Sequence, residues 1–150
     1  YFVKDEFPEA DIDRVIRMCM FHDMGEAFTG DIPAFEKTEQ HEVEETRRVE
    51  QWLASLPEPY RIELVRLFTE MEAQETLEAK IYKALDKMEA LISHNEADIA
   101  TWLPLEYDLN LVYGTEQVKF SEYMQRLKAE INQDTRDKID KTDKTDTAIV

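Results

Sequence analysis

Residues 76–94 read TLEAKIYKALDKMEALISH, and this stretch decides the fold class. Its apolar residues recur three or four positions apart, which places them along one face of an α-helix. They are Leu77, Ile81, Ala84, Leu85, Met88, Leu91 and Ile92. No glycine or proline interrupts the pattern. The stretch therefore predicts a long helix, from about Thr76 to His94, that buries one of its faces.

The same spacing recurs on both sides of this helix. It predicts a helix after Pro8, others over about 40–53 and 60–72, and a last one over about 116–133. The helix after Pro8 is apolar nearly all round, which is typical of a central position. The chain has only 3 glycines and 5 prolines, and it lacks alternating segments rich in valine and isoleucine. We therefore expect an all-α protein, a bundle of about five to six packed helices.

Length and composition favour one domain followed by a tail. The chain has 150 residues, the usual size of one domain, and 43% of them are hydrophobic, enough for a core. We expect residues 1–133 to form a single helical domain. From Asp134 onward Asp, Lys and Thr alternate with few apolar residues, so residues 134–150 are expected to be a polar, mobile tail.

The charge and the apolar runs exclude several classes of partner. The net charge is −16, with 34 acidic against 18 basic residues, which argues against a long nucleic acid as partner. A small phosphate compound is still compatible if a metal ion supplies positive charge. No apolar run approaches the roughly 20 residues that cross a bilayer, so no membrane partner is expected. A single cysteine, Cys19, suits a small core residue in a reduced, cytoplasmic protein.

A pair of ionisable residues, His22 and Asp23, follows the apolar run 18–21 directly. Burying a carboxylate is costly unless it is paired or coordinates a cation. Neighbouring helical positions point about 100° apart, so the two side chains are not expected to meet, but both can reach one ion over the helix end. Imidazole nitrogen and carboxylate oxygen suit Mn, Fe, Co, Ni or Zn. The pair therefore predicts one divalent metal ion.

Two more carboxylates follow within ten residues. Glu26 comes four residues after His22, on the same face one turn later. Asp31 follows Gly30 in the loop that would close over the helix end. Acids gathered in this way repel one another unless a cation intervenes. The alternative for each is an ordinary capping or surface acid.

Asp86 is a third candidate ligand. It lies in the helix predicted over 76–94, at the border of the apolar stripe. Taken alone, an acid at this position is more typical of a solvated helix residue than of a ligand.

Two stretches resemble a known family. HDMGEAFTGDIP, at 22–33, resembles the signature of HD-domain phosphohydrolases, and more narrowly of their 5′-deoxynucleotidase branch, in which the His-Asp pair is followed by Glu and then by Gly-Asp-(Leu/Ile)-Pro. KALDKMEALISHNE, at 83–96, resembles the later helix of that branch, which carries a distal metal-binding Asp. The similarity spans about residues 10–98, and the two motifs come in the expected order.

The resemblance implies an HD-domain-like fold of packed helices around one divalent metal ion. The ligands in that family are an upstream His, the His-Asp pair and the distal Asp, and His22, Asp23 and Asp86 match the last three. Glu26 and Asp31 match acids that the family places beside the metal for catalysis. The implied activity is removal of phosphate from deoxyribonucleoside 5′-monophosphates.

One ligand of the family pattern has no counterpart. The three histidines are His22, His41 and His94, so none precedes His22. Since the chain opens on Tyr1 rather than Met, we expect the domain to be N-terminally incomplete and the upstream His to precede Tyr1. His41 and His94 match no ligand position and suit surface or helix-end roles. Lys37, just past the loop, suits either a phosphate contact or a solvated lysine.

Two other functions compete with the nucleotidase. Other HD proteins hydrolyse cyclic nucleotides, triphosphates or guanosine alarmones, and the residues do not select the phosphoester. The high acidic charge and the missing histidine also suit a non-catalytic acidic helical module that binds a protein. In each enzymatic case the partner is a small nucleotide or other phosphoester, and the aromatic residues suit a homodimer interface as well as a core.

Overall fold

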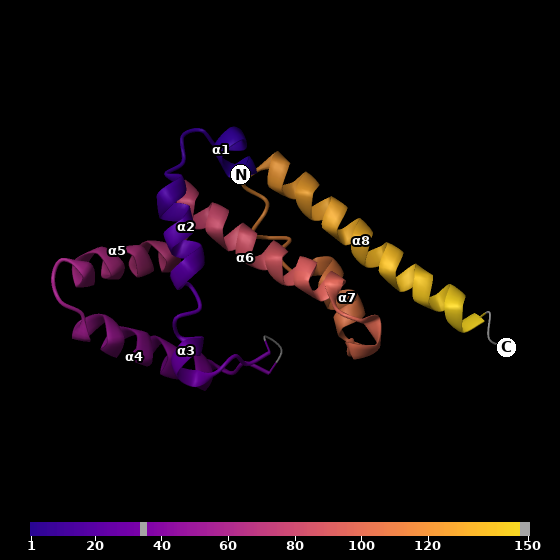
Figure 1. Ribbon diagram of the computed structural model, residues 1–150, viewed down its shortest axis with the longest axis horizontal. Coiled ribbons are helices and arrows are strands. Elements are labelled where there is room, and N and C mark those ends of the chain that lie inside the picture. Colours follow the sequence, from indigo (N-terminus) through magenta and orange to yellow (C-terminus); the bar gives the residue numbers. More distant parts are fainter. Residues whose placement is uncertain (34–35, 148–150) are drawn as a thin grey trace. The chain divides into compact units, whose positions relative to one another are not determined.

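The computed structural model describes residues 1–33 and 36–147, with side chains up to Lys141 (Figure 1). All regular structure in these residues is helical, which confirms the all-α prediction. In chain order the helices are α1 (Phe2–Glu6), α2 (Ile12–Phe21), α3 (Glu26–Thr29), α4 (Glu39–Ser55), α5 (Tyr60–Ala73), α6 (Leu77–Glu96), the 3₁₀ helix η1 (Ile99–Thr101), α7 (Glu106–Val112) and α8 (Glu122–Thr147).

The chain divides into two compact units. One consists of residues 9–79, and the other consists of residues 1–8 together with the chain from Lys80 onward. The helices with ten or more residues are α2, α4, α5, α6 and α8, in keeping with the expected bundle. The expected helix over 76–94 is α6, and its face with Ile81, Ala84 and Met88 is buried. That residues 1–133 form one domain stays a prediction.

An aromatic cluster around Trp52 connects the helices of the unit formed by residues 9–79. From α4, the Trp52 ring lies 6.3 Å from Phe21 at the end of α2 and 6.4 Å from Phe28 in α3, measured between centroids. It meets Phe68 of α5 edge-on at 6.5 Å. Each such pair contributes about 0.5–1.5 kcal/mol beyond its buried area. The cluster therefore fixes the point at which the chain leaves α2.

A partly buried ion pair joins α2 to α5 in the same unit. Nε of Arg14 donates to Oε2 of Glu70 at 2.6 Å, and Thr76 Oγ1 donates to the other oxygen of Glu70 at 2.6 Å. Thr76 in turn accepts from the backbone N–H of Ala79 in the first turn of α6. Glu70 thus ties α2 and α5 to the segment that leads into α6.

Helix α4 begins where the sequence predicts. Thr38 is its N-cap, with Oγ1 accepting from the backbone N–H of His41, while Nδ1 of His41 accepts from the backbone N–H of Thr38. This reciprocal capping box satisfies two of the unpaired N–H groups at the helix start. His41 is therefore a helix-end residue, as expected from its mismatch to the ligand pattern.

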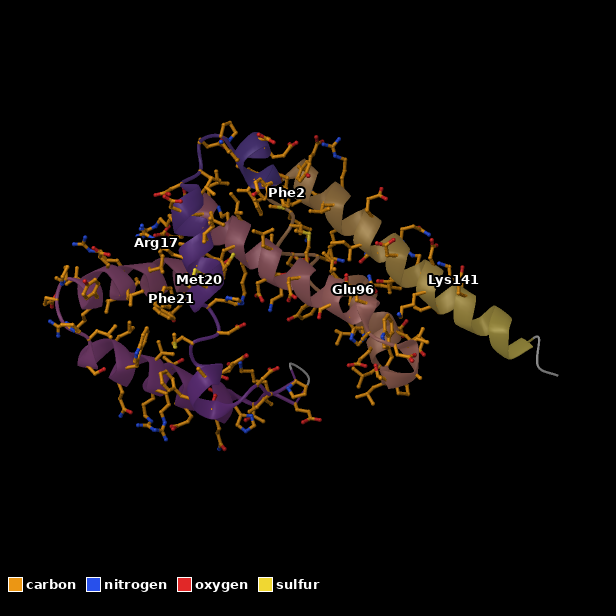
Figure 2. All side chains as sticks on the ribbon, in the orientation of Figure 1. Phe2, Arg17, Met20, Phe21, Glu96 and Lys141 are labelled. Carbon is orange, nitrogen blue, oxygen red and sulfur yellow. The ribbon has the colours of Figure 1, made fainter. Side chains whose placement is uncertain are left out.

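Helix α2 is less buried than its composition suggests. Val15 and Met18 are buried, whereas Ile16 is 50% exposed and Met20 is 73% exposed. Figure 2 labels Met20 on α2. The prediction of a central helix, apolar and covered all round, is wrong for the described residues. The helix has only ten residues and buries a single side.

The second unit contains a polar core between α6, α7 and α8. Thr135 is fully buried, and its Oγ1 donates to Oδ1 of Asn95 in α6 at 2.9 Å. Nδ2 of Asn110 in α7 donates to Oγ1 of Thr135 at 3.1 Å and to Oδ1 of Asn95 at 3.0 Å. Paired in this way, three polar side chains can be buried without a desolvation penalty for an unmade bond.

This polar core explains where the structure departs from the expected tail. The last helix begins at Glu122 rather than near residue 116, and it continues through residue 134 to Thr147 instead of giving way to irregular chain. Two hydrogen bonds hold its later turns: Oγ1 of Thr135 donates to Oδ1 of Asn95, and Nζ of Lys138 donates to the backbone oxygen of Asn95. A search for apolar residues misses both. The expectation for residues 148–150 lies outside the described residues. The short helices α1 and α7 also went unpredicted.

No helix in the described part of the chain combines the length and the apolar character needed to span a membrane.

Replacing Glu70 by Gln tests the bond between α2 and α5. Burial opposes ionisation of Glu70, but the hydrogen bonds from Arg14 and Thr76 outweigh it and hold the pKa of Glu70 below its ordinary value of 4.5. The ionised carboxylate therefore stabilises the fold above that pH, and its contribution is lost as the pH falls through the folded-state pKa. Because Arg14 is partly exposed, we expect Glu70→Gln to lower the free energy of unfolding by about 1 kcal/mol at pH 7.

Urea unfolding of both proteins between pH 7 and pH 3 measures this effect. The difference in the free energy of unfolding between the natural protein and Glu70→Gln should shrink below about pH 4.5. Glu72→Gln, an exposed position on the same helix, is the control and should change little. A loss that is the same at every pH would show that the charge of Glu70 does not act as described.

Candidate functional site

His22 and Asp23 meet at the end of α2. His22 is the C-cap of the helix, and Asp23 lies in the turn that follows. Nε2 of His22 is 3.0 Å from Oδ2 of Asp23, and Nδ1 of His22 is 2.8 Å from the backbone oxygen of Cys19. The expectation that these neighbours would not meet is wrong, because the helix ends at Phe21 and Asp23 is released from helical geometry.

The contacts of His22 fit a metal ligand. The backbone oxygen of Cys19 can only accept a hydrogen bond, so Nδ1 carries the proton and Nε2 faces the carboxylate. A ring nitrogen and a carboxylate oxygen, both electron donors, stay this close when a proton or a cation lies between them. Two ligands about 2.1 Å from one ion and about 90° apart are separated by about 3.0 Å. The distance between Nε2 and Oδ2 therefore suits a shared ion.

Glu26 follows in the first turn of α3. Partial burial raises the pKa of Glu26 above its ordinary value, and the negative charges of Asp23, Asp31 and Glu45 act in the same direction, against the opposing charge of Lys37. The three predicted acids Asp23, Glu26 and Asp31 thus lie within electrostatic reach of one another. A carboxyl group with a raised pKa beside a cation site is typical of proton transfer.

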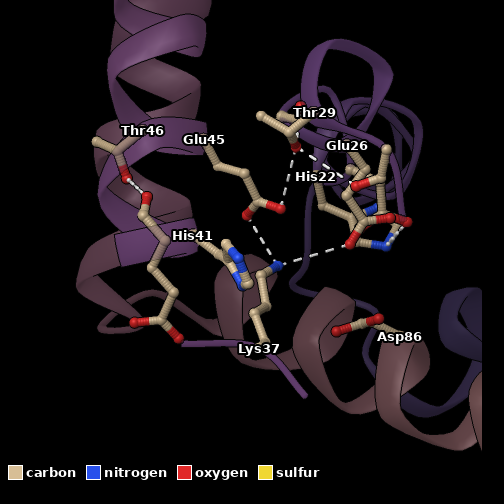
Figure 3. A network of polar contacts seen from close by, with 12 residues as sticks. His22, Glu26, Thr29, Lys37, His41, Glu45, Thr46 and Asp86 are labelled. Carbon is tan, nitrogen blue, oxygen red and sulfur yellow. Dashed lines mark hydrogen bonds and ion pairs between the residues drawn. The ribbon is translucent and has the colours of Figure 1, made fainter. Parts of the chain in front are cut away.

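Lys37 lies between two carboxylates (Figure 3). Its Nζ is 2.8 Å from Oε2 of Glu45 and 3.7 Å from Oε1 of Glu26. Its side chain is only 22% exposed, so the alternative of a freely solvated lysine is wrong for this position. Burial by itself lowers the pKa of Lys37, but the hydrogen bond and charge of Glu45, with the charge of Glu26, outweigh burial and raise it.

Sequence reasoning missed Glu45. It lies on α4, in a segment so rich in Glu and Arg that no single acid stands out. The available signal is Gly25, where an added Cβ would lie 3.2 Å from the Cβ of Glu45. A glycine directly after the His-Asp pair thus marks a close approach of another element, although the sequence does not say which.

Asp86 lies in α6 with its side chain 17% exposed. Its Oδ2 is 2.9 Å from Nζ of Lys83 and 3.3 Å from Nζ of Lys87. The alternative of a fully solvated helix acid is therefore not what the structure shows. Two ammonium groups thus flank the carboxylate and offset its negative charge.

The lysine next to Asp86 is held by a tight turn. Nζ of Lys87 donates to the hydroxyl of Tyr113 at 2.7 Å and lies over the Tyr113 ring. Burial lowers the pKa of Lys87, but the hydrogen bond to Tyr113 and the charge of Asp86 outweigh it and raise the pKa. Gly114 follows with φ of +74°, and a Cβ there would lie 2.9 Å from the Cβ of Lys87.

Among the side chains that the structure describes, in residues 1–33 and 36–141, no group of three or more His, Cys, Asp and Glu is arranged to hold a metal ion. The structure brings His22 to Asp23, and Glu26 to Lys37. The full ligand set of His22, Asp23 and Asp86 stays a prediction.

The chain is similar to a family model and to several curated proteins. The family model described as HD domain matches residues 1–128. The human protein named 5'-deoxynucleotidase HDDC2 is 41% identical over 87 residues, covering 56% of this chain and 42% of that protein. Its mouse counterpart is 42% identical over 87 residues, covering 56% and 43%, and its zebrafish (Danio rerio) counterpart is 34% identical over the same shares.

The matched part thus spans about two fifths of the length of these curated relatives, as the shares of 42% and 43% show. No solved structure gives a significant match to the chain.

Replacing Gly114 by Ala tests the turn that supports Lys87 beside Asp86. A side chain at this φ is strained, and the new Cβ would press on Lys87, so we expect a loss of about 2 kcal/mol in the free energy of unfolding. Gly25→Ala is the comparison, because Gly25 has a helical φ of −59° and an added Cβ there would lie 3.2 Å from its nearest neighbour. Its effect should be smaller, within about 1 kcal/mol. Urea unfolding measures both. A Gly114→Ala variant with an unchanged free energy of unfolding would contradict this account of the turn.

Proposed function

We propose that this chain, which belongs to the HD domain family, is a metal-dependent phosphohydrolase. The proposed reaction removes phosphate from deoxynucleoside or nucleoside 5′-monophosphates. The observation that carries this proposal is the His22–Asp23 pair, with Nε2 and Oδ2 3.0 Å apart and Nδ1 directed to a backbone oxygen. The substrate class is supported by relatives named 5'-deoxynucleotidase, which match over 56% of this chain.

One divalent metal ion is the proposed cofactor, and Mn, Co, Fe, Ni and Zn all suit its ligands. His22, Asp23 and Asp86 would hold it. When bound, the ion lowers the pKa of water and offsets phosphate charge. The backbone oxygen of Cys19 orients His22 for this role, and Lys83 and Lys87 flank the carboxylate of Asp86.

Glu26 is the proposed proton acceptor. Its raised pKa follows from partial burial and from neighbouring acids, and it brings the carboxyl group closer to the range in which proton transfer at neutral pH is efficient. Asp31, exposed in the loop after α3, would position or protonate the departing 5′ oxygen. The alternative assignment exchanges the roles of Glu26 and Asp31.

Phosphate release provides the test of the activity. The protein with its natural N-terminus should release phosphate from nucleoside 5′-monophosphates in the presence of Mn or Co, and much less in the presence of EDTA. Phosphodiesters, triphosphates and guanosine alarmones belong in the same panel, because activity confined to one of them would replace the nucleotidase by another HD hydrolase. Inactivity with every metal and every substrate would contradict the proposal and favour an interaction module.

Metal analysis tests the ligand assignment independently of activity. His22→Ala, Asp23→Ala and Asp86→Ala should each lower the bound metal per chain by tenfold or more, measured by elemental analysis after gel filtration. Matched controls are His41→Ala, which removes only a capping histidine, and Glu89→Ala, an exposed acid on the same helix as Asp86. If Asp86→Ala retained as much metal as Glu89→Ala, Asp86 would not be a ligand.

A further inference from the structure

The ammonium group of Lys37, which lies beside Glu26, is held by Glu45 of helix α4. Lys37 approaches Glu45 more closely than Glu26, at 2.8 Å against 3.7 Å (Figure 3). The shorter contact is within hydrogen-bond distance and the longer one is not. Glu45 on α4 therefore sets the position of the ammonium group. Glu26 lies near a positive charge that this hydrogen bond already holds in place.

Glu45 is itself held in place by the segment that follows α2. Its Oε1 accepts a hydrogen bond from Thr29 Oγ1 at 3.4 Å, and Thr29 is the last residue of α3. Gly25, just before α3, approaches Glu45 so closely that an added Cβ would lie 3.2 Å from it. Glu45 therefore contacts the start of α3, the end of α3 and Lys37.

We propose that Lys37, anchored by Glu45, is a positioning residue for Glu26. The inference rests on the proposed function, because Glu26 needs positioning only if it takes part in the reaction. Lys37 would not touch the reacting atoms. It would hold the Glu26 carboxylate in place and ionised among the negative charges around it.

The electrostatics of this cluster support the role. Asp23, Asp31 and Glu45 all disfavour an ionised Glu26, and Lys37 is the neighbour that opposes them. Without the ammonium group, Glu26 would lose its compensating charge and would take up a proton more readily. Without Glu45, Lys37 would lose the hydrogen bond that fixes its ammonium group.

Burial distinguishes this pair from an ordinary surface ion pair. The side chains of Lys37 and Glu45 are 22% and 14% exposed. The neighbouring pair of Arg47 and Glu44 is 45% and 42% exposed, which is the setting in which ion pairs contribute little. Glu44, one position before Glu45 on the same helix, therefore supplies a matched control.

The test compares kcat, KM, bound metal and thermal stability in the protein with its natural N-terminus. Lys37→Ala and Glu45→Gln should lower kcat by about tenfold or more, with KM within about twofold and bound metal unchanged. Lys37→Arg should recover most of the loss, because it restores the charge. Glu44→Gln should leave kcat, KM and metal content unchanged.

A charge-reversed double variant, Lys37→Glu with Glu45→Lys, separates positioning from stability. It restores the ion pair but puts a carboxylate beside Glu26, so thermal stability should return toward that of the natural protein while kcat stays low. Recovery of both stability and kcat would overturn the inference, because the pair would then be merely structural. A rise in KM alone would also overturn it, because Lys37 would then be binding substrate.

The same assay separates this inference from the proposed function. If the natural sequence is active and Lys37→Ala is equally active, only the positioning role is wrong. If the natural sequence is inactive on the whole substrate panel, the proposed function fails and the inference falls with it.

Discussion

The packing of three aromatic rings around Trp52 is the constraint on which the candidate site depends. Helix α2 ends at Phe21, whose ring packs against Trp52, and His22 and Asp23 follow in a turn. In a continuing helix the two side chains would diverge. In the turn they come within 3.0 Å of each other. The turn thus brings together two electron-donating atoms of neighbouring residues at a distance that suits one shared ion.

The second constraint is electrostatic. A chain with a net charge of −16 gathers Asp23, Glu26, Asp31 and Glu45 close together, and each ionised acid raises the cost of the next. Lys37 offsets part of this repulsion, and its own side chain is held by Glu45. A bound cation would offset much of the rest. The local excess of acid is therefore consistent with the proposed cation site.

The spacing of apolar residues predicted the helices that bury an apolar face. It located α6, α4 and α5 to within a few residues, because their buried faces follow helical spacing. It missed the later turns of α8, because Thr135 and Lys138 are held by hydrogen bonds to Asn95 rather than by apolar contacts. The His-Asp motif pointed to His22, Asp23 and Glu26. Glu45 went unnoticed because its role comes from a tertiary contact, and one acid among many on a helix carries no local signal.

The central claim is that His22, Asp23 and Asp86 ligate one divalent ion. An anomalous difference map from crystals of the manganese-loaded protein with its natural N-terminus tests this claim most directly. The account predicts a single strong peak about 2.0–2.3 Å from Nε2 of His22 and from a carboxylate oxygen of both Asp23 and Asp86. A map in which His22 and Asp86 contact no common peak would contradict it.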